Sequence, residues 1–187
     1  MSIPDLVLIA LKAIAIGMLV RIAVQDFTAL RIKNDQVLAL LAVAVAIVAT
    51  GFLRDFDWGK VLVLLGASAV TFVILFVFWL LKKVGAGDVK LFAVVPLLVG
   101  TDGSVTFVLA LLLATVMIYL AMKFPVLLPQ QLYRVQLEAM RRDRRIPFGV
   151  PISIAAILAL LLPVGVGALL QKPVPPPLSE LSLSDLQ

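Results

Sequence analysis

The fold of this chain follows from Gly85-Ala86-Gly87-Asp88-Val89-Lys90, a short polar stretch between two strongly apolar runs. The two glycines indicate a turn, and the runs beside it, near 60–81 and 88–100, are apolar enough to be membrane helices. The turn carries the carboxylate of Asp88. Because a charged group at a membrane edge is costly, an acid at this position indicates a functional site.

The composition of the whole chain indicates a membrane protein. Of its 187 residues, 63% are hydrophobic and only 14% are charged, and the mean hydropathy is +1.15. Soluble domains typically contain about 45–50% apolar and about 25% charged residues. We therefore expect an all-α fold, a polytopic bundle of membrane helices.

The apolar runs predict about six transmembrane helices. An even number of spans places both termini on the same side of the membrane. We expect one membrane domain over residues 1–171 and, because 172–187 is rich in proline and serine, a disordered tail after it. The predicted helices lie near 6–24, 36–53, 60–81, 88–100, 104–123 and 148–170.

The lysines and arginines predict the orientation of these helices. Basic residues gather after the first, third and fifth runs, and cytoplasmic loops are enriched in Lys and Arg. This places both termini outside the cytoplasm. The residues expected at the cytoplasmic side are Arg21, Arg31, Lys33, Lys82, Lys83, Lys90, Lys123, Arg134, Arg141, Arg142, Arg144 and Arg145, against Arg54, Lys60 and Lys172 on the other side.

A second acid, Asp26, follows the first apolar run, and the predicted topology places it on the same side as Asp88. The chain contains no histidine and no cysteine. Thiol nucleophiles, histidine bases and Cys/His zinc sites are thereby excluded. Carboxylates or lysines must carry any hydrolytic chemistry, and we expect it to need no metal and no cofactor.

Each of these features also has a purely structural interpretation. The glycines could simply form the turn, with Asp88 accepting backbone hydrogen bonds at the start of the next helix. Asp26 could be a solvated residue at the interface. The fourth run is also unusually short: about 13 residues reach roughly 20 Å across a core of about 30 Å, and Pro96 interrupts them. This run is predicted to be recessed near water, to be packed inside the protein, or to be a short helix with frayed ends.

The segment 125–146 combines apolar residues at helical spacing with a basic cluster. We expect an amphipathic helix whose Arg134–Arg145 stretch binds anionic lipid headgroups. An ordinary positively charged cytoplasmic loop explains the same residues equally well. The patch is too short to indicate nucleic-acid binding.

The surroundings of both acids resemble the type IV prepilin peptidases, a group of Gly-x-Gly-Asp intramembrane aspartyl proteases. The first family motif is an aspartate followed six residues later by Ile-Pro-Asn, and here Asp26 precedes Ile32-Lys33-Asn34, with Lys33 in place of the proline. The second motif is Gly85-Ala86-Gly87-Asp88 followed by Lys90. A looser likeness is Ile146-Pro147-Phe148-Gly149-Val150-Pro151.

The resemblance implies a multi-pass enzyme of the inner membrane that cleaves the leader peptide of prepilins at the cytoplasmic face. It implies that Asp26 and Asp88 are catalytic. The chain is similar to the short, peptidase-only members associated with tight-adherence (Tad or Flp) pili. The resemblance further implies that substrate binding or backbone positioning involves Ile32, Asn34, Gly85, Gly87, Lys90, Pro147 and Gly149.

Two other classes of function stay open on the sequence alone. In a proton- or cation-coupled transporter, the two acids would relay ions across the membrane. Few polar residues lie inside the predicted helices, which argues against such a path. In a non-enzymatic scaffold of a pilus or secretion assembly, neither acid would be needed. The oligomeric state is not indicated by the sequence.

Overall fold

The computed structural model describes residues 3–29, 31–55, 57–82, 84–123 and 148–164. Within these ranges the chain forms six helices and no strand, which confirms the all-α prediction. The predicted amphipathic segment 125–146 and the predicted tail 172–187 lie outside the described residues. The helices are α1 (Ile3–Ala29), α2 (Asn34–Asp55), α3 (Trp58–Leu80), α4 (Ala86–Val99), α5 (Ser104–Lys123) and α7 (Gly149–Leu161).

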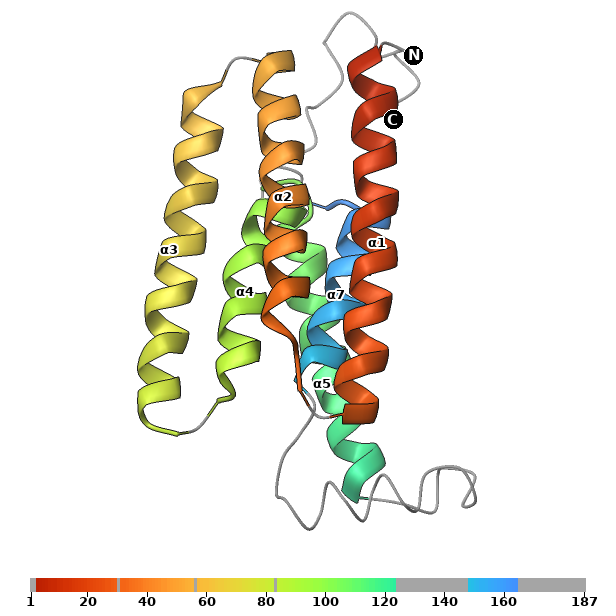
Figure 1. The fold of residues 1–187 in the computed structure, drawn as a ribbon, viewed down its shortest axis with the longest axis vertical. Helices are drawn as coiled ribbons and strands as arrows, with labels where there is room; N and C mark the ends of the chain where they lie inside the picture. Colours follow the sequence, from red (N-terminus) through yellow and green to blue (C-terminus); the bar gives the residue numbers. More distant parts are fainter. Residues whose placement is uncertain (1–2, 30, 56, 83, 124–147, 165–187) are drawn as a thin grey trace, which may run out of the picture.

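Successive helices run in opposite directions and form an up-and-down bundle (Figure 1). The ends of α1, α3 and α5 therefore lie at the same end of the bundle as the starts of α2, α4 and α7. We call this the α4-start end. An ion pair of 2.8 Å between Arg54 and Asp5 fixes the antiparallel pairing of α1 with α2 at the opposite end.

Helix α4 is the central element of the bundle. It packs against α2, α3 and α7, and six of its 14 residues are buried, including Leu91, Val95 and Leu98. These side chains join a core that α1 supplies with Leu19 and α7 with Ile152. Of the expectations for the short fourth run, packing inside the protein is therefore the one that the structure supports.

A close-packed corner connects α4 to α5 and brings both against the end of α7. Gly100 ends α4 with a φ of 73°, a conformation that favours glycine, and its N–H donates to the Pro96 carbonyl. A Cβ atom on Gly103 would lie 2.9 Å from the Ala159 carbonyl oxygen of α7. Thr106 Oγ1 also donates to the Leu162 carbonyl at 2.6 Å.

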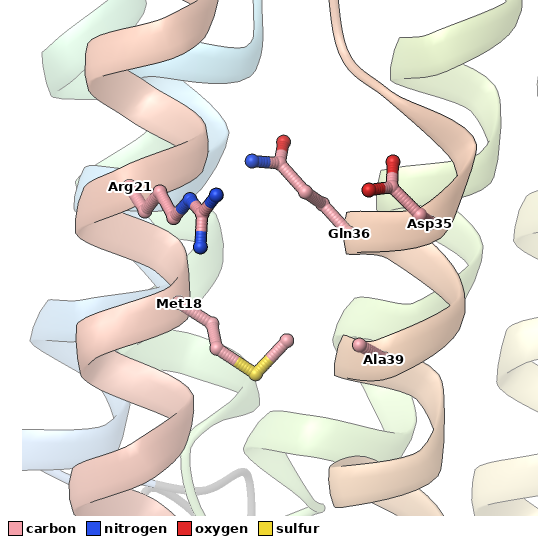
Figure 2. Close-up of a pocket in the computed structure, with 5 residues that line it drawn as sticks. All are labelled: Met18, Arg21, Asp35, Gln36 and Ala39. Atoms are coloured by element: carbon pink, nitrogen blue, oxygen red, sulfur yellow. The ribbon is translucent and has the colours of Figure 1, made fainter.

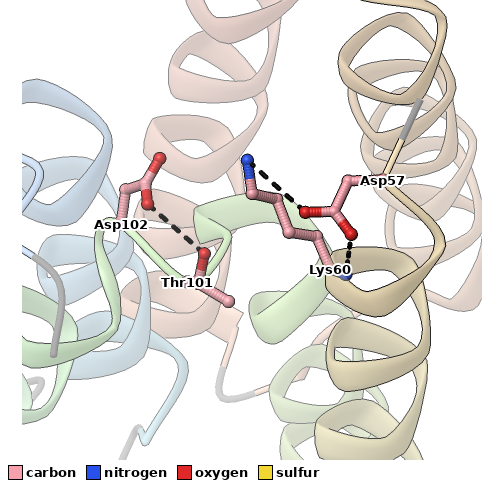
Figure 3. A network of polar contacts seen from close by, with 4 residues as sticks. All are labelled: Asp57, Lys60, Thr101 and Asp102. Atoms are coloured by element: carbon pink, nitrogen blue, oxygen red, sulfur yellow. Dashed lines mark hydrogen bonds and ion pairs between the residues drawn. The ribbon is translucent and has the colours of Figure 1, made fainter. Parts of the chain in front are cut away.

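Two other acids, Asp57 and Asp102, lie at the end opposite the α4-start end. Asp57 caps α3 by accepting from the Lys60 N–H at 3.2 Å, and its carboxylate pairs with the Lys60 ammonium at 3.9 Å (Figure 3). Asp102 accepts from the Thr101 hydroxyl at 3.3 Å. These acids are far from the Gly85–Lys90 turn and serve local structure.

Two predicted helix boundaries were wrong. Helix α1 continues to Ala29, five residues past its predicted end, because no glycine or proline lies between residues 24 and 29, so Asp26 lies within the helix. The last helix ends at Leu161, nine residues before its predicted end at 170. Pro163 lacks an N–H and disfavours helical geometry at Leu162, whose φ and ψ are −126° and 68°.

Three of the helices, α1, α2 and α3, are long and apolar enough to cross a membrane, and α5 and α7 are also apolar. Helix α3 has the surface best suited to contact lipid, because it has no buried residue and exposes large apolar side chains such as Phe72, Val73 and Trp79. The described helices thus have the character of a membrane protein.

Candidate active site

The α4-start end gathers the stretches that the sequence singled out. Asp26 lies in the last turn of α1, and Ile32 and Asn34 lie just before or at the start of α2. Gly85 precedes α4, and Gly149 is the first residue of α7. Residues far apart in the sequence thus meet because four helix ends share one end of the bundle.

Asp26 is buried against the start of α7. Its side chain lies on the same stripe of α1 as Leu19 and Ile22, and only 4% of the residue is exposed. The backbone N–H groups of Gly149 and Val150 face its carboxylate. A helix N-terminus carries partial positive charge and unpaired N–H donors, so it favours a nearby anion.

The Gly149 position leaves no room for a side chain. A Cβ atom there would lie 2.7 Å from Asp26 Oδ2 and 2.8 Å from Ile32 Cδ1. Among the described residues, Oδ2 has no hydrogen-bond partner. Leaving a buried polar atom unpaired costs about 1–3 kcal/mol, so an unpaired carboxylate oxygen of this kind indicates a functional rather than a stabilising role.

Asp88 lies in the first turn of α4 and is partly buried. Its carboxylate turns back toward the backbone N–H of Gly85, and a Cβ atom on Gly85 would lie 2.9 Å from Asp88 Oδ2. This is the geometry of a residue that caps its own helix. Asp88 therefore caps the start of α4, as the structural interpretation expected. Capping alone does not explain why Asp88 lies near Asp26.

Asp26 and Asp88 lie close enough for their charges to act directly on each other. Two like charges in a partly buried site destabilise the protein unless one of them is neutralised, so such a pair tends to share a proton. Each acid also lies at a helix N-terminus, Asp26 at that of α7 and Asp88 at that of α4, which offsets part of this repulsion.

Ile32 connects the two halves of the site. Its side chain lies 2.8 Å from the Cβ position of Gly149 and 3.0 Å from that of Gly87, and it is 9% exposed. The stretch between α1 and α2 therefore wedges between the start of α7 and the start of α4. Glycines at 87 and 149 let the backbones approach this isoleucine closely.

A hydrogen bond between side chains fastens the same stretch to α4. Lys90 Nζ donates to Asn34 Oδ1 at 3.0 Å, and both residues are exposed. The second motif of the sequence thus contacts the first directly. We call this hydrogen bond the Asn34–Lys90 clamp, because it fixes the α1–α2 connection relative to the helix that carries Asp88.

The structure brings six of the predicted site residues into one cluster and joins a further pair beside it. Pro147 lies outside the described residues. Sequence reasoning missed Val150, which contributes through its backbone N–H, a group that no side-chain motif reveals. The cluster contains Asp26, Ile32, Gly85, Gly87, Asp88 and Gly149, and the pair is Asn34 with Lys90.

A family model of the type IV leader peptidases matches residues 13–121, which include both acids and the turn before α4. The chain belongs to this family. A search of curated proteins and a search of solved structures each found no match to the chain. Membership makes this chain a peptidase, and its apolar helices indicate that this leader peptidase is a membrane protein.

Proposed function

We propose that this leader peptidase is a membrane-embedded aspartyl endopeptidase whose catalytic pair is Asp26 and Asp88. One observation carries the proposal: two acids from distant parts of the chain meet around Ile32, which lies against Gly149 beside Asp26 and against Gly87 next to Asp88. A fold built only for stability has no reason to bring two carboxylates together, because the repulsion between them is unfavourable.

The chemistry follows from one proton shared by two carboxyl groups. The ionised carboxylate acts as a general base and takes a proton from a water molecule that attacks the peptide carbonyl. The protonated carboxyl donates its proton to the carbonyl oxygen, and the pair then protonates the leaving amine. This cycle consumes one water and returns the pair to its starting protonation state.

The family membership supports prepilins as the substrates, with cleavage of the leader at the cytoplasmic face. The side of cleavage is supported by the charges at the α4-start end, where Arg31, Lys33, Lys82 and Lys90 gather. Gly87 directly precedes Asp88 and Gly85 lies three residues before it, and the lack of side chains there allows an extended substrate backbone to come close. Six spans with both termini outside the cytoplasm fit the alternating direction of the helices.

The proposal is tested by neutralising each acid without changing its shape. We expect Asp26→Asn and Asp88→Asn each to abolish cleavage of a co-expressed prepilin, measured as the shift in its size on a gel. Because both substitutions preserve volume, the proteins should still accumulate in the membrane.

Asp102→Asn is the matched control, since Asp102 lies at the opposite end of the bundle. It should leave cleavage unchanged. Near-normal processing by either Asp26→Asn or Asp88→Asn would contradict the catalytic pair.

A further inference from the structure

A second polar site lies between α1 and α2, away from the catalytic acids. It is a cavity of about 160 Å³ lined by Met18 and Arg21 of α1 and by Asp35, Gln36 and Ala39 of α2 (Figure 2). At 100° per residue, Arg21 lies about 140° around α1 from Asp26. The cavity is therefore on a different face of α1 from the catalytic acids, and the proposed peptidase mechanism does not use it.

Gln36 shows that this cavity is built for a polar ligand. The residue is 8% exposed, and among the described residues its Oε1 atom has no hydrogen-bond partner. Its amide extends into the space between the helices, toward Arg21 (Figure 2). An amide at this position is unfavourable unless something in the cavity bonds to it, because an apolar side chain would pack there without that cost.

The charges at the cavity define the ligand more closely. Arg21 offers a guanidinium, the group best suited to bind a phosphate, and Asp35 offers a carboxylate on the other helix. In the described part of the chain no ion pair joins the two. A purely anionic ligand would be attracted by Arg21 but repelled by Asp35. A ligand with a phosphate and an ammonium group satisfies both.

The remaining lining shows where the apolar part of the ligand lies. Met18 is three residues farther than Arg21 from the α4-start end, and Ala39 is three residues farther than Gln36. The polar groups thus lie nearer the end of the helices and the apolar groups about 4.5 Å deeper, at 1.5 Å per residue. This order is that of a phospholipid, with its headgroup at the membrane surface and its chains below.

We propose that the α1–α2 cavity binds the headgroup of one zwitterionic phospholipid with a primary amine, as in phosphatidylethanolamine. Arg21 and Gln36 Nε2 donate to the phosphate and the neighbouring ester oxygens. Asp35 and Gln36 Oε1 accept from the ammonium group, and Met18 and Ala39 contact the start of the acyl chains. The site is independent of the peptidase chemistry, so a test of lipid binding does not decide whether Asp26 and Asp88 are the catalytic pair.

The test measures lipid retention by the full-length protein, purified in detergent with added phosphatidylethanolamine, by native mass spectrometry. We expect one lipid to stay bound to the unmodified protein. Arg21→Gln and Gln36→Leu should each reduce retention by about tenfold, as expected for the loss of a hydrogen bond to a charged group. Arg31→Gln, at the same end but outside the cavity, is the matched control and should retain the lipid.

Two further arms identify the headgroup. Phosphatidylglycerol should be retained at least about fivefold less than phosphatidylethanolamine by the unmodified protein, and Asp35→Asn should remove this preference. Free glycerophosphoethanolamine should not displace the lipid at equal concentration. Displacement by it would show that the site binds a soluble phosphate ester, which would overturn the lipid assignment.

Thermal unfolding without added lipid is the control that shows whether each variant is folded. Gln36→Leu removes an unpaired buried polar group, so its unfolding temperature should not fall below that of the unmodified protein. The proposal is wrong if folded Gln36→Leu retains phosphatidylethanolamine as well as the unmodified protein does. Equal retention of phosphatidylethanolamine and phosphatidylglycerol by the unmodified protein would overturn it as well.

Discussion

At the scale of single residues, the character of Asp26 depends on the backbone around it. The side chain is buried, yet it faces N–H groups of Gly149 and Val150 rather than a basic side chain. Backbone donors hold an anion without committing it to an ion pair. An acid held in this way stays available for proton transfer, whereas an acid paired with arginine would be a weaker base.

The first prediction at this scale concerns Gly149→Ala. The new methyl group would lie within 2.7 Å of Asp26 Oδ2, so either the carboxylate or the start of α7 must move. Displacement of a catalytic group by about 1 Å can cost on the order of 100-fold in rate, and we expect a loss of this size in prepilin cleavage.

Gly17→Ala, in the same bundle, provides the comparison for that variant, because nothing lies within 4 Å of its Cβ position. It should cleave normally. If Gly149→Ala also cleaved normally while accumulating in the membrane, then the packing of α7 against Asp26 would have no part in catalysis.

The next prediction concerns the proton shared by Asp26 and Asp88. Cleavage by purified enzyme should follow a bell-shaped pH profile, because the base is lost when both acids are protonated and the acid is lost when neither is.

Excess chelator should leave the rate of cleavage unchanged, since a proton-sharing pair needs no cation. A loss of activity in chelator that one divalent ion restores would instead indicate metal-assisted hydrolysis.

The sequence was sufficient to single out the two acids and the glycines beside them as candidates, because turn glycines and charged groups stand out against apolar runs. It could not reveal the positions of Val150 and Gln36. The Val150 backbone N–H faces Asp26, and Gln36 is buried between two helices. Both properties depend on the arrangement of helices in space, which local composition does not encode.

At the scale of helices, hydropathy predicted the number and order of the described elements but not their ends. Apolar runs locate helices in lipid because the backbone must bond to itself there. The ends depend on local chemistry instead, as Pro163 shows at the end of α7. The central position of α4 also follows from tertiary packing rather than from its own sequence, which is no more apolar than its neighbours.

A prediction at this scale concerns the Asn34–Lys90 clamp. If the hydrogen bond positions the α1–α2 connection, then Asn34→Ala and Lys90→Met should each slow cleavage by roughly three- to tenfold, the range expected for one exposed hydrogen bond. The double variant should be no slower than the slower single variant, because both changes break the same contact.

Lys82→Met serves as the reference for these three variants, since Lys82 lies at the same end of the bundle outside the clamp. Initial rates of prepilin cleavage give the measurement. Losses that simply multiply in the double variant would mean that Asn34 and Lys90 act separately, for example by each contacting the substrate.

At the scale of the whole molecule, the alternation of helix directions explains how two motifs 62 residues apart meet. Each short connection reverses the chain, so the end of α1 and the start of α4 reach the same end of the bundle. This could be predicted from the count of apolar runs together with the basic residues. Which helix packs against which could not, since all the apolar faces are chemically alike.

Cysteine labelling tests this topology, and the chain has no native cysteine to interfere. Single cysteines at Arg31 and Lys82 should react with a membrane-impermeant reagent only from the cytoplasmic side. Cysteines at Asp57 and Asp102 should react only from the other side. Labelling of positions 31 and 82 from opposite sides would separate the two acids and exclude their cooperation.

Helix α3 has a different relation to the bundle from that of the other helices. It contributes no buried side chain and is held chiefly through its packing against α4. Natural selection therefore constrains it weakly: most of its residues are interchangeable with other apolar types, provided that its length and the Asp57 cap are kept. Over evolutionary time we expect its sequence to drift faster than that of α4.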